Sequence, residues 1–169
     1  MTTRPRNSDP APRYSVVEAL ELLERALGRI AGATNERSAD ELIEPLEPGG
    51  WSARDVLGHI RACHATWGGY IERILDEDHP SFRAESPRTT IDRTDFLEQA
   101  FKASLAAFTR DRERLMARLR AADPRDLART AAVNLPGFGI QDRSVRYYAD
   151  RLADHENQHV RHIERVVGR

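Results

Sequence analysis

The sequence predicts an all-α fold, a four-helix bundle with a metal site between the second and fourth long helices. Four stretches repeat apolar residues at steps of three and four, which places those residues on one face of a helix. Hydrophobic residues make up 40% and charged residues 31% of the 169 residues, as expected for amphipathic helices with solvated outer faces. No convincing series of strands competes with this pattern. We therefore expect four helices that bury their apolar faces against one another.

The first helix is expected to begin after Ser15. Ser15 and Glu18 have the spacing of a capping box, in which a hydroxyl and a carboxylate each bind a free amide at the helix start. The apolar stripe of this helix ends near residues 33–35. A second capping box, Ser38 with Glu41, precedes a short helical turn that prolines interrupt.

The second long helix is expected to start at Ser52. Serine is a favourable N-cap, and Asp55 adds a negative charge at the positive end of the helix dipole. The inward stripe of this helix passes through either His59 or Ile60, then through Cys63, and continues to Ile74. The sequence thus predicts that one histidine lies on a buried face.

The middle of the chain predicts a loop followed by the third helix. Residues 79–94 are polar and contain prolines, so we expect a loop there. Apolar residues then repeat at helical spacing over residues 97–119, interrupted by charge at residues 111–112, until Asp123 and Pro124 end the helix. Pro124 is able to begin another short turn, and residues 130–139 fit either an extended or a looped segment.

The last long helix is expected to start between Asp142 and Ser144 and to run to about Val167. Its apolar stripe steps by three or four residues throughout, and His155 and His159 both lie on that stripe. The fourth helix therefore directs two histidines toward the bundle.

Composition limits the class of protein. The net charge is −1 with both signs interspersed, which argues against a nucleic-acid partner. No segment approaches the roughly 18 consecutive apolar residues of a membrane span. The single cysteine cannot form an internal disulfide, which fits a cytoplasmic protein. We expect one domain over residues 14–169, preceded by a proline-containing disordered arm over residues 1–13 that lacks the apolar run of a signal peptide.

Three histidines form the candidate metal site. His155 and His159 are four residues apart, so their imidazoles point from one helix face toward a common position. His59, on the inward face of the second helix, supplies a third ligand. Three protein ligands leave a position for water or substrate, which is the arrangement of a catalytic rather than a closed structural site.

Other residues near these ligands have several interpretations. Cys63 lies one turn beyond His59 and is either a soft fourth ligand or a small apolar filler, and we favour the filler. His162 is too far along the helix to share one ion with both histidines of the pair, so it is a second-shell, rim or exposed residue. Asp154 and Glu156 lie off the stripe, and we expect ordinary solvated charges.

The segment from His155 to His159 also fits the His-Glu-x-x-His pattern of zinc proteases, with Glu156 as general base. Those enzymes present a substrate-binding sheet and take a third ligand downstream. Only residues 160–169 follow the motif, and no edge-strand series is visible. We therefore do not favour a protease.

Three stretches together carry a resemblance to a known family: Ser38–Leu42, Trp51–Ile60 and Asp154–Ile163. The sequence resembles the DinB-like (DinB/YfiT) superfamily of metal-binding four-helix bundles. The resemblance places the family's three metal ligands on His59, His155 and His159. Relatives often carry glutamine after the second histidine of the pair, whereas this chain has His162.

The resemblance also implies a function. Some members are similar to thiol-dependent S-transferases, so we expect a metal-dependent transferase that uses a low-molecular-weight thiol on a small electrophilic substrate. Zinc or nickel is the expected divalent ion, no catalytic residue is assigned, and a homodimer is compatible with a small bundle. The alternatives are a noncatalytic stress-associated protein that binds a metal or ligand, a metal-dependent hydrolase, and an interaction module without metal.

Overall fold

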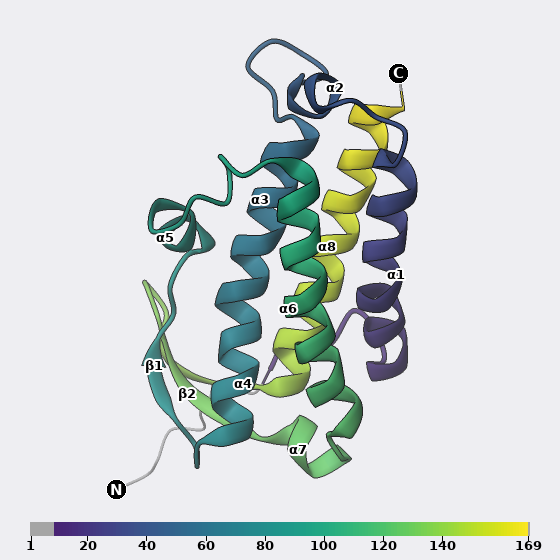
Figure 1. The fold of residues 1–169 in the computed structure, drawn as a ribbon. Coiled ribbons are helices and arrows are strands. Elements are labelled where there is room, and N and C mark those ends of the chain that lie inside the picture. The colour runs from purple at the N-terminus through teal and green to yellow at the C-terminus, as the bar shows by residue number, and fades with distance from the viewer. Residues whose placement is uncertain (1–8, 169) are drawn as a thin grey trace, which may run out of the picture.

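A computed structural model describes residues 9–168 of the chain and confirms the predicted four-helix bundle. Figure 1 shows the four long helices running side by side, with the N-terminal part of the chain and the C-terminus at opposite ends. The second long helix is continuous but contains one turn of π-helix, η1. The bounds of the long helices are α1 Val16–Thr34, α3 Ala53–Cys63 with η1 His64–Gly68 and α4 Gly69–Asp76, α6 Phe101–Ala121, and α8 Val145–Val167.

The shorter elements lie in the connections between these helices. Three short helices are α2 Ala39–Ile43, α5 Pro87–Asp92 and α7 Pro124–Ala128, and three strands are β1 Ser81–Arg83, β2 Thr130–Leu135 and β3 Gly139–Ser144. Strand β2 is central, with β1 parallel on one side and β3 antiparallel on the other. Figure 1 shows this small sheet beside the end of the bundle where α4 ends.

The expectation of a plain loop over residues 79–94 was wrong. This segment contains β1, which pairs with β2 in the register Phe82↔Val133, and the short helix α5. The segment of residues 130–139, for which two conformations were open, is extended as β2 up to Leu135. A strand of three residues is too short to show an alternating pattern in the sequence. Its hydrogen bonds are made with a partner strand some fifty residues away.

Hydroxyl caps fix where the helices begin. The predicted capping boxes at Ser15, Ser38 and Ser52 are all present, each with its side chain bound to the backbone amide three residues later. Ser144 caps α8 by accepting a hydrogen bond from the amide of Tyr147. These local contacts set the phase of each helix, and hence the direction in which its histidines point.

The first and last helices pack along one another. Arg29 of α1 binds Glu164 through both carboxylate oxygens at 2.7 and 2.9 Å, and it binds the side-chain oxygen of Asn157 at 2.8 Å. The backbone amide of Tyr14 donates to Asp150 at 2.8 Å. The bundle is therefore closed by the two ends of the sequence.

The segment before α1 also contacts α8. Asp9 accepts hydrogen bonds from the amide (3.3 Å) and the hydroxyl of Ser144, and Arg13 donates its backbone amide to Asp150 at 3.1 Å. Residues 1–8, part of the arm expected to be disordered, lie outside the described residues. From residue 9 onward the chain follows the start of the last helix.

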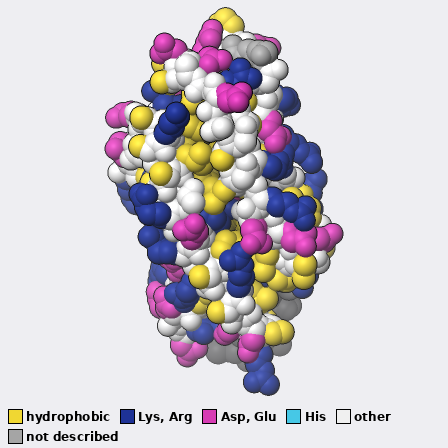
Figure 2. All heavy atoms as spheres, turned by 45° about the vertical axis from the view of Figure 1, so that its right-hand side comes forward, with side chains coloured by type: hydrophobic (Ala, Val, Ile, Leu, Met, Phe, Trp, Pro, Cys, Tyr) yellow, Lys and Arg dark blue, Asp and Glu magenta, His cyan; other side chains and the backbone are white. Residues whose placement is uncertain are grey.

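Charged side chains of both signs are interspersed over the surface, and Figure 2 shows them around a strip of hydrophobic side chains on one face. This distribution agrees with the net charge of −1. Among residues 9–168, none of the helices combines the length and the apolar content that a membrane crossing requires.

Candidate metal centre

The structure brings together the three histidines that the sequence singled out. His59 projects from α3, and His155 and His159 project from successive turns of α8. The Nε2 atom of His155 lies 3.3 Å from Nε2 of His59 and 3.2 Å from Nε2 of His159. One ring nitrogen from each of the three residues lies within 4.8 Å of the others. Residues 96 positions apart in the sequence thus direct their nitrogens at one point.

Close packing holds α3 in position next to His59. A Cβ atom at Gly58 would lie 2.8 Å from the carbonyl oxygen of Phe96 and 2.7 Å from Cδ2 of Leu97. The chain that leads into α6 therefore touches the backbone of α3 where only glycine fits. This contact and the capping box at Ser52 fix both the height and the rotation of His59.

The environment keeps all three imidazoles neutral. Burial lowers the pKa of His59, and burial together with His59 and Arg151 lowers the pKa of His155 to about 4. Burial, with the charges of the other histidines, lowers the pKa of His159 to about 3. A neutral imidazole has one nitrogen with a free lone pair, which is the form that binds a metal.

Hydrogen bonding among the three rings cannot satisfy them. A neutral imidazole has a single N–H, so the Nε2 of His155 can donate a hydrogen bond to only one of its two neighbours, His59 or His159. Toward the other neighbour, two ring nitrogens then face each other without a good hydrogen bond. A cation that accepts a lone pair from each ring removes this conflict. Tetrahedral zinc with bonds of about 2.0–2.1 Å has ligand-to-ligand edges of roughly 3.3–3.4 Å. The spacings of 3.2 and 3.3 Å fit such an ion.

Two tryptophans flank the cluster. Trp51 lies 5.1 Å from the ring of His59 and stacks on His159 at 6.1 Å between centroids, and its side chain is 44% exposed. Trp67, which is buried, meets His155 edge to face at 5.1 Å. The three histidines themselves are half-buried, so the cluster is open to solvent on one side.

Cys63 lies beside the cluster rather than within it. Its Sγ atom is 3.5 Å from Nε2 of His59, and the group of three mutually close ligand atoms does not include it. Burial, reinforced by the negative charge of Glu156, raises the pKa of the thiol to about 12. The thiol is therefore protonated at neutral pH, and its interpretation as an apolar filler stays a prediction.

The second shell of the cluster is sparse. A ring bound through Nε2 carries its proton on Nδ1, and metal-bound histidines usually donate that proton to a carboxylate or carbonyl oxygen. The Nδ1 atom of His155 is buried, and no residue in the described part of the chain accepts from it. Burial is the main cause that lowers the pKa of the half-buried His162, whose nitrogens lie outside the ligand group.

The expectation that Glu156 is an ordinary solvated charge was wrong. Its side chain is 3% exposed and forms an ion pair with Arg112, which is 1% exposed. Arg112 also donates to the carbonyl oxygen of Leu23 at 2.8 Å and lies 3.4 Å from Nδ1 of His64. The charged interruption in the third helix is thus the partner of a glutamate on the fourth.

Asp154 is the other acidic residue that adjoins His155 in the sequence. It forms an ion pair with Arg13 at 3.2 Å and accepts a hydrogen bond from Gln158 at 3.1 Å. His79 is exposed, and its Nε2 atom lies 3.5 Å from a carboxylate oxygen of Asp142. Neither Asp154 nor His79 belongs to the histidine cluster.

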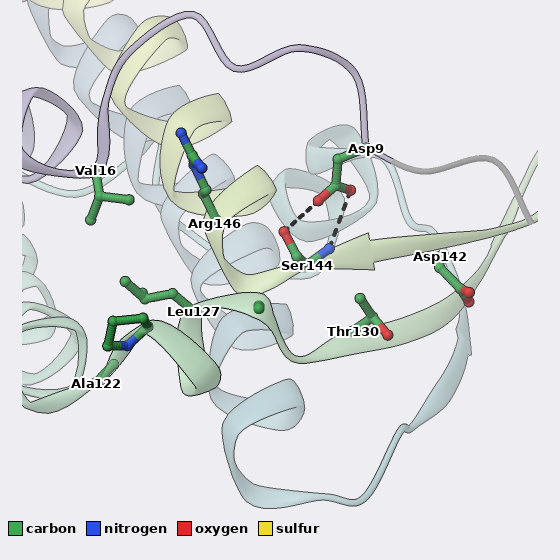
Figure 3. A pocket seen from close by; sticks show the side chains of 10 residues that line it. Asp9, Val16, Ala122, Leu127, Thr130, Asp142, Ser144 and Arg146 are labelled. Carbon is green, nitrogen blue, oxygen red and sulfur yellow. Dashed lines mark hydrogen bonds between the residues drawn. The ribbon is translucent and has the colours of Figure 1, made fainter.

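A separate cavity lies away from the histidine cluster. It has a volume of about 790 Å³ and lies at the start of α8, where Figure 3 shows Asp9 bound to Ser144. None of the three histidines lines it, and Arg146 on its wall is nine residues from His155, roughly 13 Å along a helix. Its lining combines apolar residues such as Val16 and Leu127 with the charged residues Asp9, Asp142 and Arg146. The cavity is therefore separate from the histidine cluster.

Comparisons with known proteins agree with the fold. A sequence model of the family described as the DinB superfamily matches residues 22–163. The structure is similar to that of YfiT from Bacillus subtilis, described as a probable metal-dependent hydrolase with an unusual four-helix bundle topology. That match has a TM-score of 0.75 and 20% identity and covers 97% of this chain and 91% of the other.

A second solved structure, TT2238, is described as a four-helix bundle protein. It has a TM-score of 0.62 and 22% identity over 89% of this chain and 99% of that one. The search of curated proteins gives no significant match.

Proposed function

This chain belongs to the DinB superfamily, and from that premise we propose that it binds one divalent metal ion through His59, His155 and His159. The observation that carries the proposal is the convergence of three neutral Nε2 atoms at 3.2 and 3.3 Å, a spacing that hydrogen bonds cannot satisfy and a cation can. Zinc or nickel suits three imidazoles.

We propose further that the site serves a transferase that joins a low-molecular-weight thiol to a small electrophilic molecule. A bound divalent cation lowers the pKa of a thiol or water that enters its open position. The thiol has to come from outside the protein, because Cys63 is the only cysteine and is buried with a raised pKa. Trp51 and Trp67 provide apolar walls for the carbon skeleton of the reactants.

A metal-dependent hydrolase is the first alternative, because YfiT is described as a probable one. In a site of the His-Glu-x-x-His kind, the glutamate would act as general base beside the metal. Here Glu156 is held by Arg112 inside the bundle, so it is not available to take a proton from water at the cluster. This contact argues against a hydrolase in which Glu156 is the general base. A noncatalytic metal- or ligand-binding protein is the remaining alternative.

Elemental analysis of the untagged protein tests the metal site. We expect one divalent ion per chain in the wild type and none in His59→Ala or His159→Ala. His64→Gln is the matched control, since His64 is a buried histidine outside the cluster and its replacement should leave the ion bound. A wild-type protein without stoichiometric metal, or a His59→Ala variant that keeps it, contradicts the site.

An activity panel separates the functions. The metal-loaded protein is incubated with several low-molecular-weight thiols and an aryl halide or epoxide, and products are identified by mass. Thiol adducts that form only with wild-type protein support transfer, whereas hydrolysis of an ester or amide panel supports the alternative. Bound metal with no turnover in either panel would favour the noncatalytic function.

A further inference from the structure

Arg151 lies one helical turn before His155 on the same face of α8, because residues 151, 155 and 159 are spaced by four. Its guanidinium carbon lies 4.5 Å from the ring centroid of Trp67, and that ring meets the imidazole of His155 at 5.1 Å. These two separations place the guanidinium within about 10 Å of the His155 ring, no more than the screening length at 0.1 M salt. An exposed cation thus lies close to the histidine cluster.

No carboxylate among residues 9–168 pairs with Arg151. Arg151 also forms no hydrogen bond within these residues. By contrast, Arg29 and Arg112 each form an ion pair with a glutamate of α8. Asp154, the carboxylate one turn away, pairs with Arg13 instead. Stacking on an indole leaves the N–H donors of a guanidinium free in its plane, where they match the two oxygens of a carboxylate.

The tryptophan that supports Arg151 is placed by the irregular turn of the second helix. Trp67 lies in η1, between α3 and α4, and is buried there. Single turns of π-helix are rare and occur frequently at functional sites. The wide turn places one indole against both a ligand imidazole and a cation, so the two are held at a fixed separation.

We infer that Arg151 is an anion-binding residue of the site and that the thiol or the electrophile carries a carboxylate, which Arg151 binds while the reacting group occupies the open position. The inference rests on the proposed function and names its substrate class. A short carbon chain between the carboxylate and the reacting atom spans this distance. Uncharged reactants of the same size lack that contact.

Matched thiols test the inference by calorimetry on the metal-loaded protein. The probes are 3-mercaptopropionate and its uncharged amide, 3-mercaptopropionamide. We expect the wild type to bind the anionic thiol about tenfold more tightly, since one charge-assisted hydrogen bond contributes about 1.5–3 kcal/mol and 1.4 kcal/mol is tenfold. Arg151→Gln should lose the preference, and Arg151→Lys, which keeps the charge but not the fork, should retain part of it. Arg161→Gln, which removes an exposed cation from another face of α8, should keep it fully.

Equal affinities for the two thiols in the wild type, or a preference that persists in Arg151→Gln, would overturn the inference.

A second experiment, by fluorescence, does not depend on the metal. The chain has two tryptophans, so Trp51→Phe leaves Trp67 as its only indole fluorophore. Acetate should change that fluorescence saturably in Trp51→Phe and not after Arg151→Gln is added. If neither thiol binds the metal but acetate still acts through Arg151, the proposed function fails and the anion site stands. Absence of the acetate response overturns the anion site.

Discussion

Two polar clusters lie in the same bundle, and adjacent residues of α8 belong to different ones. His155 joins His59 and His159 at a half-buried position, where three ring nitrogens face one another. Glu156 joins Arg112 in the interior, where the carboxylate and the guanidinium match each other. The side chains of consecutive helical residues point about 100° apart, so one helix serves both clusters.

The difference between the clusters lies in what each one lacks. In the ion pair of Arg112 and Glu156 opposite charges meet, and the terminal nitrogens of Arg112 also reach Leu23 and His64, while its Nε has no hydrogen-bond partner among the described residues. The histidine cluster has three like groups, no counter-ion within the described residues and a nitrogen of His155 without a partner. A cluster in which opposite charges are matched indicates a structural role, whereas three like nitrogens that face one another indicate a place for a cation.

The largest effect is expected from breaking the interior cluster on one side only. Glu156→Leu leaves the guanidinium of Arg112 charged and unpaired in the core, which should lower the free energy of unfolding by about 3–5 kcal/mol. Urea titration followed by circular dichroism measures the loss. A loss below about 1 kcal/mol would show that the pair is solvated and that the contrast between the clusters is not real.

Removal of the metal should have the next largest effect, and only through the histidine cluster. An ion present at one hundred times its dissociation constant stabilises the folded chain by about 2.7 kcal/mol. Adding a chelator to the wild type should therefore lower its melting temperature by several degrees. His159→Ala should not respond to the chelator, while His64→Gln should respond as the wild type does. A wild-type melting curve that the chelator leaves unchanged would count against a stabilising ion.

Acid should test the interior cluster through His64. Burial and the charge of Arg112 lower the pKa of His64 to about 3, so the unfolded chain binds a proton that the folded chain does not between about pH 6.5 and that value. The contribution of neutral His64 to the free energy of unfolding is therefore fully present above pH 6.5. It is lost as the pH falls toward 3, by up to about 1.4 kcal/mol per pH unit. His64→Gln should show a shallower slope of unfolding free energy against pH in chelator-treated protein. Equal slopes would contradict a neutral buried His64.

The smallest effect is expected from replacing both members of the interior pair. Arg112→Met with Glu156→Leu substitutes apolar groups of similar size for a buried ion pair, an exchange that is often neutral or stabilising. We expect the double variant to unfold within about 1 kcal/mol of the wild type and to keep its metal. A loss as large as that of Glu156→Leu alone would mean that the pair contributes net stability.

Local signals in the sequence predicted much of the fold and the three candidate ligands. The capping boxes at Ser15, Ser38 and Ser52 depend on residues three positions apart, so a reader of the sequence sees both partners together. The histidine pair is likewise visible from its spacing of four. His59 followed from the apolar stripe of its own helix.

The features that were missed depend on partners far along the chain. Glu156 reads as a surface charge until α6 brings Arg112 against it, 44 residues away in sequence. Strand β1 has only three residues and exists because β2 pairs with it. Trp67 contacts both His155 and Arg151 from a π-helical turn. A pattern with 3.6 residues per turn does not predict such a turn.

The pairing of the first and last helices has a consequence for synthesis. Helix α1 leaves the ribosome first, yet the partner of Arg29, Glu164, is 135 residues later. Contacts of such long sequence separation slow folding, and domains synthesised from the N-terminus must wait for them. Two of the three histidines arrive with the same late helix. The nascent chain therefore exposes the apolar faces of three helices until α8 closes the bundle and assembles the histidine cluster.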